Sequence, residues 1–169
     1  MINQKVKLHN RFDFEIYDIE TSEIEHAQAE NIVLNTLYSI SPASFSSLYA
    51  NIQVGTGTGT LAPTRTTLFN RIAGKATEAV ETVYDTDETA HRTVKTIFGT
   101  TEANGNWTEV GLATTTTSGV LTHAIITDSE GNPITITKTD TKIITVYATV
   151  YAEVLSPASG QFIFGKGSW

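Results

Sequence analysis

The chain has 169 residues, enough for one domain with its own core, and its 18 acidic and 11 basic residues give a formal net charge of −7. An acidic chain repels nucleic-acid phosphates, so we expect no direct binding of DNA or RNA. The absence of cysteine excludes disulfides, thiol catalysis and cysteine-ligated zinc. The N-terminal residues do not resemble a secretory signal, and no run of 18 apolar residues predicts a membrane span.

Threonine dominates the composition, with 29 residues, about one in six. Its branched side chain favours the pleated strand, so the chain is predicted to be mostly β. Apolar and polar residues alternate over 5–8 and 12–16, which predicts a strand with Phe12, Phe14 and Ile16 on one face. Residues 24–29 are predicted to return antiparallel as a hairpin.

Two short helices are expected in the first half. Ile32 to Tyr38 has nearly helical spacing, with Asn31 as a cap and Pro42 as a stop. Tyr49 to Val54 is predicted to be a strand that leads into a glycine-rich loop. Residues 68–72 are predicted to form one or two helical turns that end near Gly74.

From Ala76 onward the sequence predicts short strands separated by turns, at 78–84, 89–98, 108–113, 121–127 and 134–137. A strong turn signal lies at 128–133. The longest alternating run, 142–154, predicts a half-buried strand. We expect Ile144, Val146, Ala148 and Val150 to be buried, with Lys142 and Thr149 more exposed.

Many short strands with frequent turns indicate a mainly antiparallel β fold, a sandwich or flattened barrel with one or two short helices. We expect a single β-rich domain over residues 1–155. Residues 156–169 then form a C-terminal extension, because Pro157 and Gly160 interrupt the strand pattern.

The glycine-rich loop 55–59 follows a strand, as phosphate-binding turns do. It lacks the Lys-Ser/Thr of a P-loop and the G-x-G-x-x-G spacing, so a flexible or sharply turning surface loop is the favoured interpretation.

No other motif nominates a catalytic or metal site. His9, His26, His91 and His123 are scattered, so solvent-facing or interface positions are favoured over metal ligation. The acidic residues near 85–88 and 128–132 are interpreted as hairpin tips rather than cation sites. No carboxylate pair or G-x-S-x-G motif is singled out, so we expect no enzyme activity and no cofactor.

Four phrases, in order along residues 27–154, resemble those of small virion proteins of tailed bacteriophages, of the kind found around collars, tail tips, fibres and head surfaces. The phrases are A-E-N-I-V-L-N at 29–35; I-Q-V-G-T-G-T-G-T at 52–60, with Pro63 and T-L-F-N at 67–70; G-N-W-T-E-V-G-L at 105–112; and L-T-H-A at 121–124, with 131–141. The resemblance implies a β-sandwich-like, non-catalytic and oligomeric protein, and carries no catalytic residue onto this chain.

We therefore expect a virion protein, made in the host bacterial cytoplasm, that assembles with itself and with other virion proteins as a collar, tail, fibre adaptor or capsid decoration. Trp107, Glu109 and Leu112 are expected to serve packing or a hairpin. The alternative is a receptor- or carbohydrate-binding module of the tail, acting through aromatics such as Tyr147 and Tyr151.

The C-terminal extension is the candidate interface. It is too apolar for a solvated terminus, so we expect it to dock on its own domain or on a neighbouring subunit. The residues expected to do so are Phe162, Ile163, Phe164 and Trp169.

Overall fold

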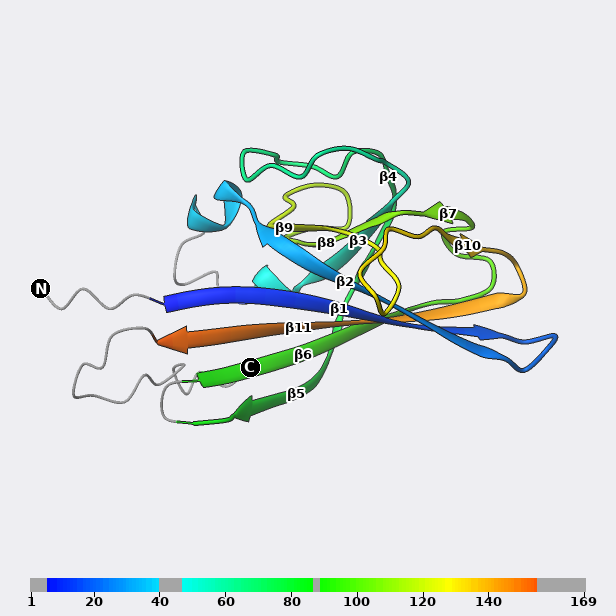
Figure 1. Ribbon diagram of the computed structural model, residues 1–169, viewed down its shortest axis with the longest axis horizontal. Coiled ribbons are helices and arrows are strands. Elements are labelled where there is room, and N and C mark those ends of the chain that lie inside the picture. Colours follow the sequence, from blue (N-terminus) through cyan, green and yellow to red (C-terminus); the bar gives the residue numbers. More distant parts are fainter. Residues whose placement is uncertain (1–5, 40–46, 87–88, 155–169) are drawn as a thin grey trace, which may run out of the picture.

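The computed structural model describes residues 6–39, 47–86 and 89–154, and within these ranges the chain is almost entirely β (Figure 1). The first strands are β1 (Val6–Asp18), β2 (Ile24–Val33), β3 (Asn51–Gly55), β4 (Arg71–Ala76), β5 (Glu78–Tyr84) and β6 (Thr89–Phe98). They are followed by β7 (Gly105–Trp107), β8 (Glu109–Ala113), β9 (Thr122–Ile125), β10 (Ile136–Lys138) and β11 (Lys142–Val154).

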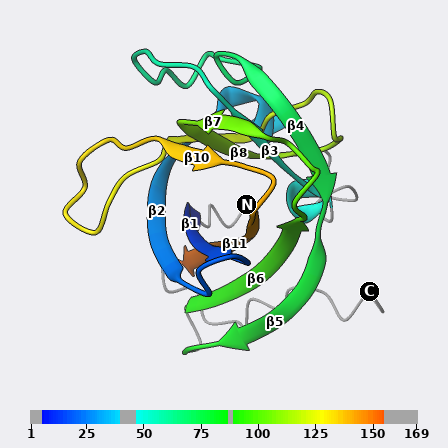
Figure 2. The ribbon, with the colours of Figure 1, turned by 90° about the vertical axis from the view of Figure 1, so that its right-hand side faces the viewer.

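Nine strands form one curled antiparallel sheet in the order β4-β3-β8-β9-β2-β1-β11-β6-β5, and β7 pairs with β10 in a small second sheet. The two edge strands, β4 and β5, follow one another in the chain and are separated only by Thr77. Figure 2 views the molecule along the strands and shows the continuous β4–β5 stretch running round one side of it. The sheet is thus a half-barrel whose two ends are linked by the chain itself, which confirms the predicted mainly antiparallel β fold.

The core lies on the concave face of the sheet. Phe12, Phe14 and Ile16 are all buried, as their alternation predicts. On β11 the predicted inner face is also confirmed, since Ile144, Val146, Ala148 and Val150 are at most 4% exposed.

Thr149, on the outer face of β11, was expected to be more exposed than the inner-face residues, but it is still buried, with 9% of it accessible. It lies between Arg11 of β1 and Thr93 of β6, and its hydroxyl is 3.0 Å from that of Thr93. A short side chain in the centre of a sheet is shielded from solvent by the side chains of the two neighbouring strands, even on the open face. Alternation therefore assigned the correct face but the wrong exposure. Lys142 is more exposed than the four core residues, as expected, since 20% of its side chain is accessible.

The small sheet closes over one part of the core. Trp107 of β7 is fully buried and stacks edge-on against Phe98 of β6, with ring centroids 5.0 Å apart. Its indole Nε1–H donates to the backbone oxygen of Ala103, which satisfies the one polar atom of the side chain. Leu112 of β8 is also buried, so both Trp107 and Leu112 serve packing.

The two expected helices have different outcomes. Residues 32 and 33 extend β2, and the first expected short helix occurs as a 3-10 helix, η1 (Asn35–Ser39), which starts later than predicted. The second expected helix is absent, because residues 69 and 70 form bends and β4 starts at Arg71. The backbone N–H groups of Phe69 and Asn70 donate to the Glu109 carboxylate, and β3 provides an edge for residues 71–76. Tertiary pairing therefore overrides a weak local helical pattern.

The strand predictions in the second half fare better. The ranges 78–84, 89–98 and 142–154 are confirmed as β5, β6 and β11. The predicted strands at 108–113, 121–127 and 134–137 correspond to the shorter β8, β9 and β10, displaced by one or two residues. The C-terminal extension 156–169 lies outside the described residues.

Candidate functional site

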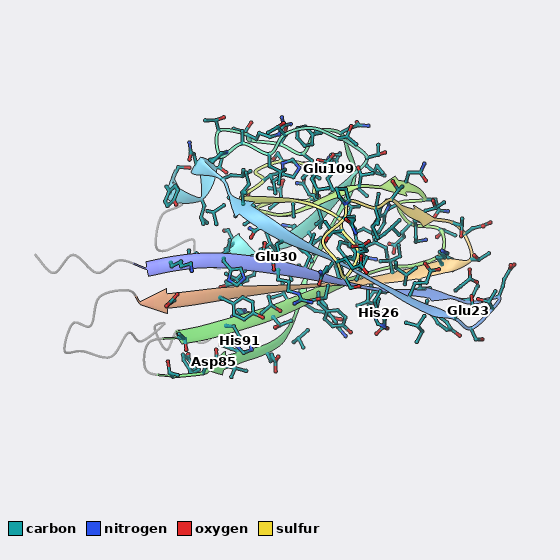
Figure 3. All side chains as sticks on the ribbon, in the orientation of Figure 1. Glu23, His26, Glu30, Asp85, His91 and Glu109 are labelled. Atoms are coloured by element: carbon teal, nitrogen blue, oxygen red, sulfur yellow. The ribbon has the colours of Figure 1, made fainter. Side chains whose placement is uncertain are left out.

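Glu109 occupies the first position of β8, where the curled sheet meets the glycine-rich loop (Figure 3). Its side chain and that of His123, on the neighbouring strand β9, are both 0% exposed. A charged group this deeply buried is stable only when its lone pairs are satisfied. We call Glu109, His123 and the three residues whose N–H groups bind the carboxylate the Glu109 cluster.

Each carboxylate oxygen of Glu109 accepts two hydrogen bonds. Oε1 accepts from the backbone N–H of Gly57 at 2.9 Å and of Asn70 at 2.8 Å. Oε2 accepts from the backbone N–H of Phe69 at 2.8 Å and from Nε2 of His123 at 2.7 Å.

This arrangement decides the ionisation of Glu109. Burial opposes the charge, but the hydrogen bonds from His123, Asn70 and Phe69 outweigh it and lower the pKa of the carboxyl group. The acid is therefore an anion at neutral pH.

The imidazole of His123 has one defined role. Because the carboxylate is an anion, Nε2 carries the proton and donates it to Oε2. The other ring nitrogen, Nδ1, is buried without a hydrogen-bond partner.

The glycine-rich loop wraps closely around this anion. A Cβ on Gly55 would lie 2.5 Å from Oε1 of Glu109. A Cβ on Gly57 would lie 2.7 Å from the same oxygen and 2.0 Å from Cβ of Phe69. The sequence predicted a surface loop here, but Gly55 and Gly57 are both buried. The N–H of Gly57, which a phosphate would need, already binds the protein's own carboxylate.

Ring contacts complete the cluster. The rings of Phe69 and His123 lie 4.9 Å apart, and the guanidinium of Arg65 lies 3.9 Å from the centroid of the Phe69 ring. The expectation that His123 faces solvent or an interface is therefore wrong. The sequence held one signal of this arrangement: the glycines of 55–59, which indicate a close approach of the backbone to another group.

A second group of polar and aromatic residues lies on the convex face, away from the core. His9 of β1 and Tyr151 of β11 stack with ring centroids 4.7 Å apart and 14° between their planes. His91 of β6 follows on the other side of Tyr151 at 5.5 Å. We call these residues the His9–Tyr151–His91 row, and it crosses three adjacent strands.

Carboxylates flank this row on the β5 side. Nδ1 of His91 is 2.9 Å from Asp85, and Nε2 is 3.9 Å from Glu81. Asp87 and Glu88, which completed the acidic run in the sequence, lie outside the described residues. Within the described ranges, no group of three or more His, Cys, Asp or Glu residues is placed to hold a metal ion.

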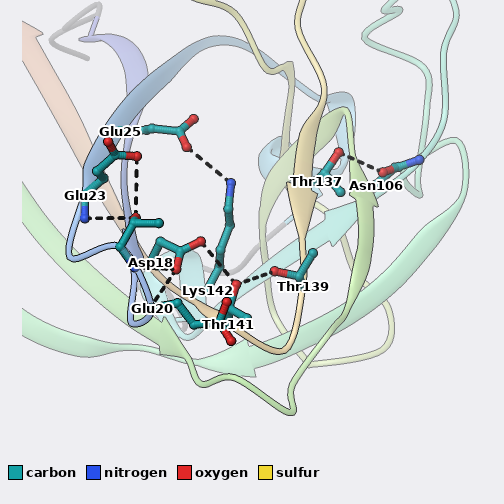
Figure 4. A network of polar contacts seen from close by, with 10 residues as sticks. Asp18, Glu20, Glu23, Glu25, Asn106, Thr137, Thr139, Thr141 and Lys142 are labelled. Atoms are coloured by element: carbon teal, nitrogen blue, oxygen red, sulfur yellow. Dashed lines mark hydrogen bonds and ion pairs between the residues drawn. The ribbon is translucent and has the colours of Figure 1, made fainter.

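A third polar network secures the tip of the β1–β2 hairpin (Figure 4). The Asp18 carboxylate accepts the backbone N–H of Glu20 at 2.9 Å and the hydroxyl of Thr141 at 3.1 Å. The bond from Glu20 lowers the pKa of Asp18. Lys142 contacts Glu25 at 3.2 Å and ties β11 to β2. The polar groups of this network bind one another, so the network stabilises the hairpin turn.

The predicted turn at 128–133 is built in the same way. The Asp128 carboxylate accepts the backbone N–H groups of Glu130 and Asn132, both at 2.9 Å. The bonds from Asn132 lower the pKa of Asp128. The Asp128 side chain therefore stabilises the turn in which it lies.

Comparisons with protein-family models, curated proteins and solved structures found no match for this chain. Among the described residues, no helix has the length and apolar character needed to cross a membrane. The candidate interface residues Phe162, Ile163, Phe164 and Trp169 lie outside the described ranges.

Proposed function

We propose that this protein is a non-enzymatic structural component of a tailed bacteriophage particle, assembling with copies of itself and with other virion proteins. The observation that carries the proposal is the convergence of the resembling phrases inside the fold. The members of the Glu109 cluster come from three separate phrases: Gly57, Phe69 and Asn70 from the second, Glu109 from the third, and His123 from the fourth.

Residues that are distant in the sequence but in contact in the fold hold the strands and loops together. The resemblance therefore rests on positions that are physically coupled, which supports a shared architecture rather than chance similarity of short segments. The carboxylate of Glu109 and the imidazole of His123 are both buried from solvent, which is consistent with a structural role for the cluster.

The Glu109 cluster holds the loop between Gly57 and Asn70 in place on the protein. The Glu109 carboxylate binds N–H groups at both ends of the segment 57–70, so one buried anion fixes where this loop leaves and re-enters the sheet. Between these anchors most residues of 58–67 are exposed and uncharged. A firmly anchored, weakly charged loop suits a protein that contacts neighbours in an assembly.

Two measurements test this proposal. Mass spectrometry of purified phage particles should detect the protein in many copies per particle, and native mass spectrometry of the isolated protein should give a defined oligomer. A protein absent from washed particles, and monomeric at every concentration, would refute the proposal.

A receptor- or carbohydrate-binding module is the second candidate, and the His9–Tyr151–His91 row is the observation that favours it. Tyr151 is 36% exposed, and Tyr147 lies on the same face of β11. Glycan-array binding that is lost in Tyr147→Ala and Tyr151→Ala would support this function. Tyr38→Ala is the matched control, because Tyr38 is 80% exposed on η1. Arrays with no signal would favour the structural role.

A further inference from the structure

Strand β5 ends the large sheet, and no strand of the described chain pairs with its outer edge. Its inward-facing side chains also lack cover. Ala79 and Tyr84 lie directly opposite Val94 and Ala90 of β6, so they share the face of those buried residues. Yet Ala79 is exposed and Tyr84 is 62% exposed. The core therefore stops at β6, one strand before the sheet does.

An open edge with uncovered apolar side chains favours pairing with another strand. Val80, at the bulge in β5, is also 46% exposed. Natural sheets avoid such edges unless something covers them. A segment that added a strand here would bring its own inward side chains over Ala79, Thr82 and Tyr84 and extend the core.

We infer that the outer edge and inward face of β5 receive the C-terminal segment 161–169 of a neighbouring copy. This inference rests on the proposed self-assembly. Phe162 and Phe164 alternate with Ile163, so a strand made from this segment places two aromatic side chains on one face. That is the pattern needed to cover the exposed apolar residues of β5.

Charge and length agree with this occupant. The 15 residues after Val154 carry one lysine and no acidic residue, in a chain whose net charge is −7. Strand β5 and the turn after it present the carboxylates of Glu78, Glu81 and Asp85, which are 62%, 54% and 41% exposed and outnumber the Lys95 and His91 side chains that they contact. Fully extended, 15 residues span about 50 Å, which is enough to reach an adjacent subunit.

The strand order favours a neighbour's segment over the chain's own. The described chain ends in β11, which is separated from β5 by β6. The chain's own segment must therefore reverse direction and cross the end of β6 before it reaches the free edge. A segment from another copy can approach that edge from outside the sheet.

The absence of cysteine allows a direct test. Thr82→Cys and Gly165→Cys are introduced into separate full-length proteins, which are mixed and treated with a short bismaleimide crosslinker. We expect a heterodimeric crosslinked species, identified by peptide mass spectrometry, as the main product. Thr64→Cys, an exposed threonine in the 57–70 loop, replaces Thr82→Cys in the matched control and should crosslink at least tenfold less.

A chain that carries both Thr82→Cys and Gly165→Cys separates the alternatives. Crosslinking only within this double variant would mean that the segment folds back on its own β5, and would overturn the inference. Equal crosslinking in the Thr64→Cys control, or none in any sample, would also overturn it. If stable oligomers of the unmodified protein persist in those cases, the proposed structural function survives and only the docking site is wrong.

Discussion

Replacing Glu109 by glutamine keeps the shape of the side chain but exchanges one oxygen acceptor for an NH2 donor. All four partners of the carboxylate donate hydrogen bonds, so the amide nitrogen must face donors in either orientation. If it replaces Oε1, the N–H groups of Gly57 and Asn70 lose their acceptor. If it replaces Oε2, His123 can accept through its other tautomer, but the N–H of Phe69 remains unsatisfied.

Each buried donor left without a partner costs about 1–3 kcal/mol, and hydrogen bonds to a neutral oxygen are weaker than those to a carboxylate. Removing the buried charge offsets part of this loss. The lowered pKa of Glu109 indicates that its hydrogen bonds outweigh its desolvation, so the net effect is destabilising. We expect a loss of about 3 kcal/mol in the free energy of unfolding.

Urea denaturation followed by circular dichroism measures this change. With a slope typical of small domains, the midpoint should fall by roughly 1–2 M. Glu130→Gln is the matched control, because Glu130 is exposed in the 128–133 turn, and it should alter stability by less than about 0.5 kcal/mol. Hydrogen exchange should also accelerate at the amides of 57–70. An unchanged midpoint in Glu109→Gln would show that the cluster contributes little to the fold.

Gly57→Ala should destabilise strongly, because its Cβ would lie 2.0 Å from Cβ of Phe69, whereas Gly99→Ala, with no neighbour nearer than 3.5 Å, should melt close to the wild type. Val146→Asp should cost several kcal/mol by placing an unpaired charge in the core, and a wild-type melting curve would reject the assignment of β11. Stability should fall as the pH drops below 4.5 and through the lowered folded pKa of Glu109, because the unfolded chain takes up its proton first; Glu109→Gln should flatten this dependence. Treatment with a chelator should leave the melting temperature unchanged, and a marked decrease would reveal a structural metal.

The sequence alone was sufficient for the fold class and for the bounds of β5, β6 and β11. Alternation over 142–154 identified β11 and its buried face, because side chains of a strand point to opposite sides whatever its partners are. Turn residues separated β5 from β6 with correct boundaries. These features depend only on neighbouring residues, so one sequence is enough to predict them.

Exposure and weak helical patterns were decided by tertiary contacts. Thr149 is shielded by side chains from two other strands, and no local pattern contains that information. Residues 68–72 have helical spacing, but two of their N–H groups are bound by Glu109, which lies about 40 positions away in the chain.

The candidate site was beyond sequence reasoning for the same physical reason. The glycines of 55–57 indicated close approach of the backbone to something, and the sequence suggested a phosphate or a plain surface loop. Only the folded chain brings Glu109 and His123 into that position, because β3 lies far from β8 and β9 in the sequence but next to β8 in the sheet. A buried carboxylate has no sequence pattern of its own, since its partners are backbone N–H groups that every residue type except proline provides.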